Sequence, residues 1–222
     1  MKRIHLIGML TCLSICCVFT ACKKDKDKLG GSNSISTITA TSIVNSADAA
    51  DVAIVKLMSG NYEVVAGEYS GSGFMLTLPA TVPATELERL GTASGLKVSD
   101  PDVGVMMIES VTCFDETKYE IGDFLSMKEE EKSKDVTMAM YWYVDGDVTV
   151  MGKVELTNET DNYNLNLKKG WNMLYLTEQS ANNYMVTTTP KSGMQWVFFD
   201  ISMRSAKSAK LTEKMKRLSL FK

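Results

Sequence analysis

The 222-residue sequence has only one histidine, His5, and it lies close to the N-terminus. The residues around it are typical of a secretory signal, with Lys2 and Arg3 at the start and an apolar run of fourteen residues over 6–19. That run is shorter than the roughly 18 residues that a membrane-spanning helix needs. Removal of the signal would leave a chain without histidine, which excludes Ser-His-Asp and Cys-His catalytic sites and His-ligated zinc or copper sites.

Cysteine is also scarce beyond the signal. Four of the five cysteines lie within the first 22 residues, and only Cys113 lies in the body of the chain. An intramolecular disulfide is therefore not expected, even in an exported protein. Cys113 lies in an apolar stretch that is followed by Asp115 and Glu116, and such surroundings raise the pKa of a thiol. The sequence predicts a core cysteine rather than a nucleophile.

The body of the chain has few basic residues. Residues 29–200 carry eleven Lys and Arg against 24 Asp and Glu, a net charge of −13, whereas the whole chain carries −3. The other basic residues gather in the signal, in a charged string over 23–28 and in the last 22 residues, where seven basic residues accompany one acid. Because contacts with phosphate need a basic stripe, nucleic acid is not an expected partner of this acidic body.

The residues Phe19-Thr20-Ala21-Cys22 lie between the apolar run and the charged string. An apolar residue three positions before the cysteine and a small residue directly before it resemble a bacterial lipobox. The resemblance implies cleavage between Ala21 and Cys22 and acylation of Cys22, and each buried acyl CH₂ would then contribute about 0.8 kcal/mol to membrane binding. The alternative is an ordinary signal peptide that is cut after Ala21 and leaves Cys22 as a free thiol.

These features divide the chain into four regions: a signal over 1–21, a lipidated cysteine and flexible tether over 22–48, a β domain over 49–200 and a basic amphipathic tail over 201–222. A subdivision of the domain near 115–135 stays open. The polar, β-branched stretch 34–46 could be more linker or a first edge strand. We expect the cell envelope as the location, with a lipid anchor in the outer membrane; the periplasmic and the surface side stay open.

The body has the pattern of an all-β protein. Three strand-like runs with Ser-Gly turns cover 51–79, and residues 83–91 predict one short helix that stops at Gly91. Strand candidates then recur about every 8 to 12 residues, which predicts an antiparallel β-sandwich, with two stacked subdomains or a barrel as alternatives. These candidates lie at 103–114, 119–127, 135–144, 147–156, 162–171, 172–179, 183–190 and 194–201.

Two features of the body could carry a binding site. Asp145 and Asp147 alternate as calcium ligands do, but a calcium loop needs more ligands, and Asp145-Gly146 is a strong signal for a hairpin between 142–144 and 148–150. The sequence favours the hairpin, and no metal or cofactor is expected. Exported binding modules stack sugars on exposed aromatic rings, although aromatic residues in strands are more often core. The candidate stacking residues are Tyr141, Trp142, Tyr143 and Trp171.

The last residues predict a basic helix. Leu211, Met215 and Leu218 fall on one face, and Lys210, Lys214 and Arg217 lie beside them. Such a helix could dock on the acidic body or lie on an anionic membrane surface, and the segment could also be disordered.

Three motifs resemble a group of small exported lipoproteins of uncharacterised function from Bacteroidetes-type bacteria: YSGSGFMLTLP, YWYVDGDVTVMG and YNLNLKKGWNMLYLT, all within 61–177. The resemblance implies an extracytoplasmic β domain and brings no catalytic residues. We therefore expect a lipid-anchored, non-enzymatic protein that binds or scaffolds a glycan, a peptide or another envelope protein. The alternatives are a glycan-processing enzyme that uses carboxylates alone and a carbohydrate-binding component of a polysaccharide-utilisation system.

Overall fold

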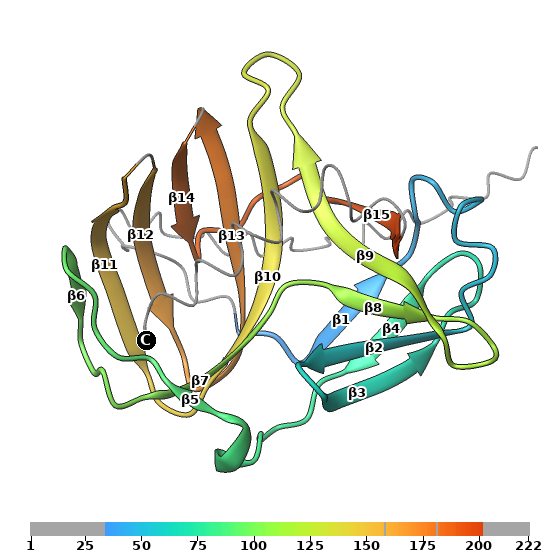
Figure 1. The fold of residues 1–222 in the computed structure, drawn as a ribbon, viewed down its shortest axis with the longest axis horizontal. Helices are drawn as coiled ribbons and strands as arrows, with labels where there is room; N and C mark the ends of the chain where they lie inside the picture. Colours follow the sequence, from blue (N-terminus) through green and yellow to red (C-terminus); the bar gives the residue numbers. More distant parts are fainter. Residues whose placement is uncertain (1–33, 158, 181, 202–222) are drawn as a thin grey trace, which may run out of the picture.

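The computed structural model describes residues 34–157, 159–180 and 182–201, and strands make up most of this part of the chain (Figure 1). Among these residues, no helix has the length and hydrophobicity needed to cross a bilayer. The elements are β1 (Thr37–Ala40), β2 (Ile54–Ser59), β3 (Tyr62–Glu68), β4 (Phe74–Thr77), the 3₁₀ turn η1 (Ala84–Glu86), β5 (Glu88–Arg89), β6 (Leu96–Val98), β7 (Gly104–Ile108), β8 (Val111–Phe114), β9 (Glu120–Glu129), β10 (Val136–Val144), β11 (Val148–Glu155), β12 (Thr160–Leu167), β13 (Gly170–Ser180), β14 (Asn183–Thr187) and β15 (Gln195–Asp200).

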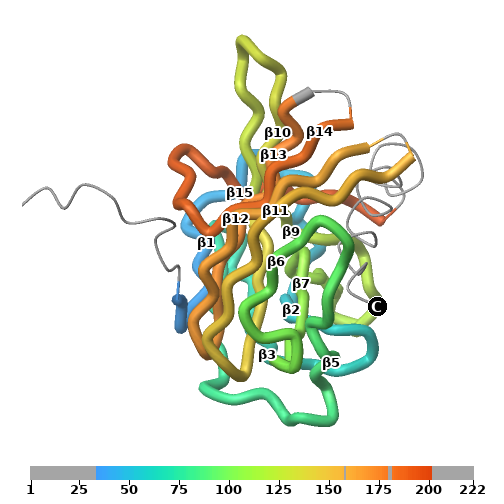
Figure 2. The backbone as a smooth tube through the Cα atoms, turned by 90° about the vertical axis from the view of Figure 1, so that its left-hand side faces the viewer, coloured from blue at the N-terminus to red at the C-terminus, as the bar shows by residue number. Residues whose placement is uncertain are grey.

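Thirteen strands form one bent sheet, and β1 pairs with β4 in a separate two-stranded sheet. The main path runs β3-β2-β8-β9-β10-β13-β14-β12-β11-β6; β15 also pairs with β9, and β7 pairs with both β10 and β5. All pairs are antiparallel except β12 with β14, because β14 inserts between β12 and β13. Figure 2 shows how β5, β6 and β7 curl over one side of the sheet. The expected all-β, sandwich-like fold class is confirmed, and every stretch expected to hold a strand holds at least one.

The sheet has two buried faces, because successive side chains of a strand point in opposite directions. We call the face that carries Met138, Met140 and Trp142 the front face; its core also takes Leu90 and residues of β11 and β12. The opposite, rear face carries Tyr141 and packs under the β1–β4 sheet. Each core draws on residues before and after 115–135, so a cut at that position would split both.

Residues 34–48, which we expected to form a tether, belong instead to the domain. Ile38 and Ala40 alternate inward from β1, and both are buried in the rear core. Gly73, directly before β4, lies so close to the Ala40 carbonyl that a Cβ atom at Gly73 would overlap it. The stretch left open between linker and strand is therefore a strand, because two of its apolar side chains are needed in the core.

The short helix expected over 83–91 is wrong beyond a single 3₁₀ turn, η1. Leu87, the residue after this turn, is already extended, and Glu88 and Arg89 then pair with β7 as strand β5. Leu90 is fully buried in the front core. The pairing with β7 and the burial of Leu90 therefore outweigh the local preference of this segment for a helix.

The hairpin expected at Asp145-Gly146 is also wrong, because β10 and β11 do not pair with each other. A two-residue turn of the favoured type needs a positive φ at both central residues, and neither Asp145 nor Gly146 has one. The Asp145 carboxylate instead accepts a hydrogen bond from the Gly104 N–H at 2.8 Å, and Asp147 accepts one from the Lys168 ammonium at 2.7 Å. That bond from Lys168, with a second from a backbone N–H, holds the pKa of the Asp147 carboxyl below its usual value. Both acids fix the turn in place.

Candidate functional site

The four aromatic residues expected to stack a ligand are core residues, so that hypothesis is wrong for each of them. Tyr141, Trp142, Tyr143 and Trp171 are 1–3% exposed. The rings of Tyr143 and Trp171 meet edge to face with centroids 5.4 Å apart, and the Trp171 indole donates a hydrogen bond to the Pro79 carbonyl. Because β10 lies in the middle of the sheet and both faces are covered, neither set of alternating side chains reaches solvent.

The hydroxyl of Tyr141 is buried on the rear face without a hydrogen-bond partner among the described residues. Burial raises the pKa of Tyr141, and the neighbouring Tyr175 adds to the rise. A buried hydroxyl without a partner costs about 1–3 kcal/mol. The position therefore weakens the rear core.

Removal of this hydroxyl is expected to stabilise the domain. Tyr141→Phe should raise the free energy of unfolding by about 1–2 kcal/mol, because it deletes an unsatisfied polar atom and keeps the ring. Urea unfolding of the two proteins measures the change. Tyr175→Phe is the control and should not stabilise, since it removes a hydroxyl that donates to the Met173 sulfur. A clear loss of stability in Tyr141→Phe would contradict this description.

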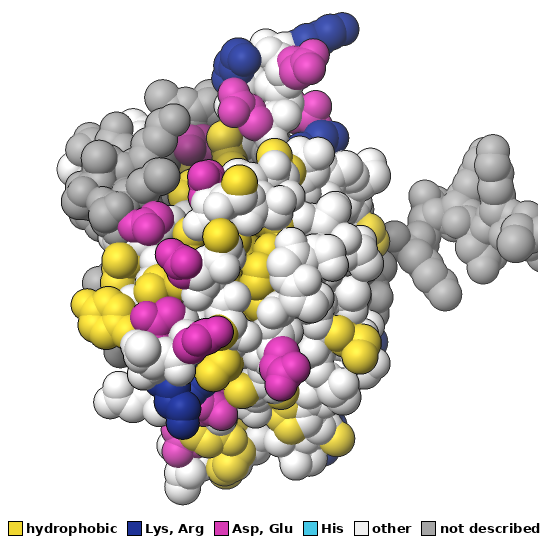
Figure 3. Space-filling model, turned by 90° about the vertical axis from the view of Figure 1, so that its right-hand side faces the viewer, with side chains coloured by type: hydrophobic (Ala, Val, Ile, Leu, Met, Phe, Trp, Pro, Cys, Tyr) yellow, Lys and Arg dark blue, Asp and Glu magenta, His cyan; other side chains and the backbone are white. Residues whose placement is uncertain are grey.

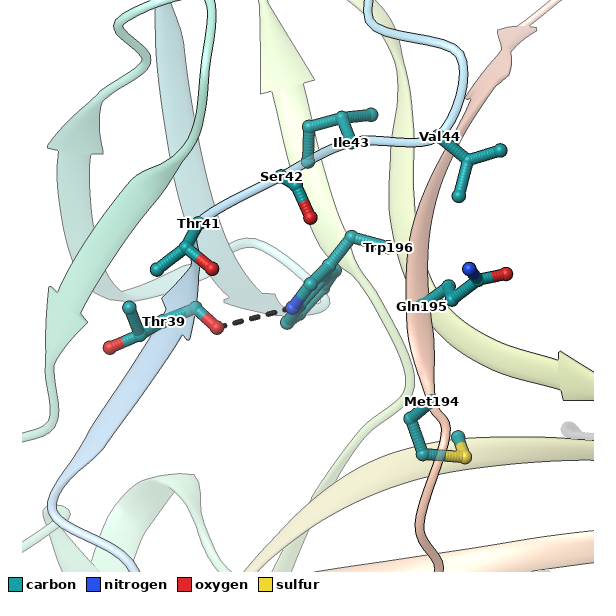
Figure 4. Close-up of a pocket in the computed structure, with 8 residues that line it drawn as sticks. All are labelled: Thr39, Thr41, Ser42, Ile43, Val44, Met194, Gln195 and Trp196. Carbon is teal, nitrogen blue, oxygen red and sulfur yellow. Dashed lines mark hydrogen bonds between the residues drawn. The ribbon is translucent and has the colours of Figure 1, made fainter.

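An open pocket of about 560 Å³ lies between the N-terminal segment and the start of β15 (Figure 4). One wall comes from β1 and the residues after it, and the other comes from the last strand of the described chain. The lining residues are Thr39, Thr41, Ser42, Ile43, Val44, Met194, Gln195 and Trp196.

Backbone and amide hydrogen bonds hold the two walls together although they lie about 150 residues apart in sequence. The Val44 N–H donates to the Trp196 carbonyl at 2.9 Å. Asn45 binds the backbone of Phe198 at both ends of its carboxamide: its oxygen accepts from the Phe198 N–H at 2.8 Å, and its nitrogen donates to the Phe198 carbonyl at 2.9 Å. The Asn45 side chain thus continues the pairing that the backbone begins, and the pocket has a fixed frame.

Trp196 is the aromatic wall of this pocket, and its ring is held from two sides. The indole N–H donates to the Thr39 carbonyl at 3.1 Å, the bond drawn in Figure 4. The ring also meets Phe74 at a steep angle of 74°, with centroids 5.0 Å apart. A partly exposed indole in a fixed orientation offers a preformed apolar surface to a ligand.

The lining of the Trp196 pocket is polar but uncharged. Thr39, Thr41 and Ser42 carry hydroxyls, Gln195 carries a carboxamide, and none of the eight residues is acidic or basic. These groups can donate and accept hydrogen bonds, but they offer no general acid, general base or counter-ion. The arrangement suits recognition of a neutral ligand.

Sequence reasoning did not nominate Trp196. It lies in the strand stretch 194–201, as Trp171 lies in another, and the local pattern of the two is alike. The two residues differ in how much of the side chain is covered by other segments. Trp196 lies near the start of β15 beside a segment from the other end of the described chain, and that segment leaves part of the indole exposed. No local signal in the sequence carries this information.

Other chemistry-bearing residues serve the turns or lie in the core. In the described part of the chain, no group of three His, Cys, Asp or Glu residues could hold a metal ion. Cys113 is fully buried, so the prediction of a core cysteine is confirmed. Cys22, Ala21 and the basic tail lie outside the described residues. Comparison with protein-family models, with curated proteins and with solved structures found no match for the chain.

Proposed function

We propose that the protein is a lipoprotein of the bacterial cell envelope, anchored in the outer membrane through acyl chains on Cys22, and that its β domain binds a ligand without altering it. The lipobox-like residues before Cys22 and the resemblance to small exported lipoproteins support the anchor. The uncharged lining of the Trp196 pocket supports binding rather than catalysis.

A neutral saccharide is the ligand class that this pocket supports best, and the Trp196 pocket is the single observation that carries the assignment. The CH face of a sugar ring can pack on the indole of Trp196 while its hydroxyls bond with Thr41, Ser42 and Gln195. A phosphate or a charged peptide would find no counter-ion here. A carboxylate-only hydrolase needs two acids about 5–10 Å apart, and no acid lines the pocket.

The test is a binding screen of the mature chain carrying Cys22→Ser against a panel of neutral oligosaccharides. Gln195→Ala and Thr41→Ala should each weaken a bound glycan at least tenfold, because each removes a hydrogen bond to a ligand hydroxyl. Both side chains are exposed, so the fold should be unaffected. Titration calorimetry measures the affinities.

Thr85→Ala is the matched control, since Thr85 is exposed on η1 and does not line the pocket. It should bind the glycan as the parent chain does. Equal affinity of all variants for a bound glycan would place the site elsewhere. Failure of the parent chain to bind any neutral glycan would refute the ligand class.

A further inference from the structure

An apolar strip crosses the front face on β15, β9, β10 and β7, where β9 pairs with both β15 and β10, and β10 also pairs with β7. Register places Val197 opposite Leu125, and Met127 opposite the core residue Met138. Leu125 is buried but belongs to neither core cluster, and the other members are half-buried. We define the apolar strip as Met107, Leu125, Met127, Val136, Val197 and Phe199.

Carboxylates accompany the apolar strip on the same face. Asp123 lies opposite Phe199, and Glu178 lies opposite Val136. Asp161 alternates with the front-core residues of β12 and is 5% exposed. Figure 3 views the molecule from the right-hand side of Figure 1, and acidic side chains with apolar side chains between them run down the left of that view.

Basic residues of the same strands point the other way. Strands β6 to β15 contain three, Lys97, Lys128 and Lys153. Register places Lys97 opposite Met151 and Lys128 opposite Thr137, both on the rear side of their strands, and Lys153 alternates with front-facing Val154. Of the charged side chains in these strands, the front face therefore collects acids alone.

The described chain ends beside this strip. Val197 and Phe199 point to the front face, and Ile201, the next residue in the alternation, is 39% exposed. The segment 202–222 follows directly, with seven basic residues and one acid. As a helix of 21 residues it would be about 30 Å long. The five steps from β15 across β9, β10, β13 and β14 to β12 cover about 24 Å.

We propose that residues 202–222 lie across the front face, with Leu211, Met215 and Leu218 on the apolar strip and with their Lys and Arg side chains toward Asp123, Asp161 and Glu178. The charges are complementary, the length suffices, and the attachment point lies at the edge of the strip. An anionic membrane surface would satisfy the basic residues but would leave the apolar strip without its cover.

Methionine oxidation in the full mature chain carrying Cys22→Ser tests the proposal. Met127 belongs to the strip, Met75 is 65% exposed on β4, and Met140 is buried in the front core. In a tail variant with all three apolar residues replaced by Ser (Leu211→Ser, Met215→Ser and Leu218→Ser), peroxide should oxidise Met127 at least threefold faster. Met75 should react at an unchanged rate, and Met140 should stay protected as evidence of an intact fold.

The matched control places substitutions on the opposite side of the same predicted helix, Ala206→Ser, Ala209→Ser and Leu220→Ser. It should leave Met127 as protected as in the parent chain. If the apolar variant unfolds and Met140 also reacts, Lys210→Glu with Lys214→Glu becomes the test, with the same expected rise at Met127.

The possible results distinguish docking of the tail on the front face from binding of the tail to a membrane. A faster Met127 in the apolar or charge variant, with Met140 protected, supports docking. Equal Met127 rates in parent, variants and control overturn it. Binding of the parent chain to vesicles of phosphatidylglycerol, with loss of binding in the charge variant and no change at Met127, would assign the tail to the membrane instead.

Discussion

Replacing Cys22 with serine should move the whole protein from the membrane fraction to the soluble fraction. Serine cannot form the thioether that carries the lipid, so the variant lacks the acyl anchor. Each acyl chain of about sixteen carbons would contribute about 0.8 kcal/mol per buried CH₂, so two or three chains amount to permanent attachment. Fractionation after an alkaline wash, together with incorporation of labelled palmitate, measures both properties.

Cys17→Ser is the matched control, since Cys17 lies inside the apolar run 6–19, before the proposed cleavage position, and would be removed with the proposed signal. That variant should stay in the membrane fraction and keep its palmitate. A Cys22→Ser protein that still carries palmitate would refute lipidation at this residue. A palmitate-free protein that stays in the membrane fraction would point to a second means of attachment.

Phe124→Ala should be the most damaging single change in the rear core. Phe124 is fully buried in β9, and its ring lies 5.2 to 5.5 Å, centroid to centroid, from the rings of Tyr69, Phe74 and Phe198. Tyr69 directly follows β3, Phe74 lies in β4 and Phe198 lies in β15, so one side chain joins β9 to the β3–β4 region and to the last described strand. Loss of the ring should cost about 3–5 kcal/mol.

Urea unfolding of the chain carrying Cys22→Ser measures this loss, which is a large part of the 5–15 kcal/mol typical of a domain. Tyr119→Ala is the control on the same hairpin, because Tyr119 is 68% exposed and an exposed substitution changes stability by no more than about 0.5 kcal/mol. A loss below 1 kcal/mol for Phe124→Ala would show that the aromatic cluster does not hold the rear core together.

The positions of most strands could be predicted from the sequence, but those of β5 and β6 and the partners of all strands could not. Alternation and turn residues mark a strand by local pattern alone, which is why each expected stretch contains one. Pairing depends on which distant strand fits alongside. Asp145-Gly146 shows the limit: the dipeptide predicts a turn, and a turn is there, but β13, β14 and β12 lie between the two strands it joins.

The candidate site was out of reach for a related reason. A strand with one exposed face would present either Trp142 or the pair Tyr141 and Tyr143 to a ligand. For that reason the sequence favoured these residues as candidates. The front and rear cores cover both faces of β10 instead. Trp196 stays partly exposed because the segment after β1 passes beside the indole without covering all of it, and that contact joins residues about 150 positions apart.

The two hydrogen bonds between the Asn45 side chain and the Phe198 backbone have a consequence for how the chain folds. Its partners are 153 residues apart, and the rear core cannot close until β15 has been made. Folding slows when such distant contacts must form first, because the loop between them loses entropy before the contacts stabilise it. We therefore expect the rear core to stay incomplete until β15 has left the ribosome. In a chain that we propose is exported, an incomplete core would help to keep the polypeptide unfolded for translocation.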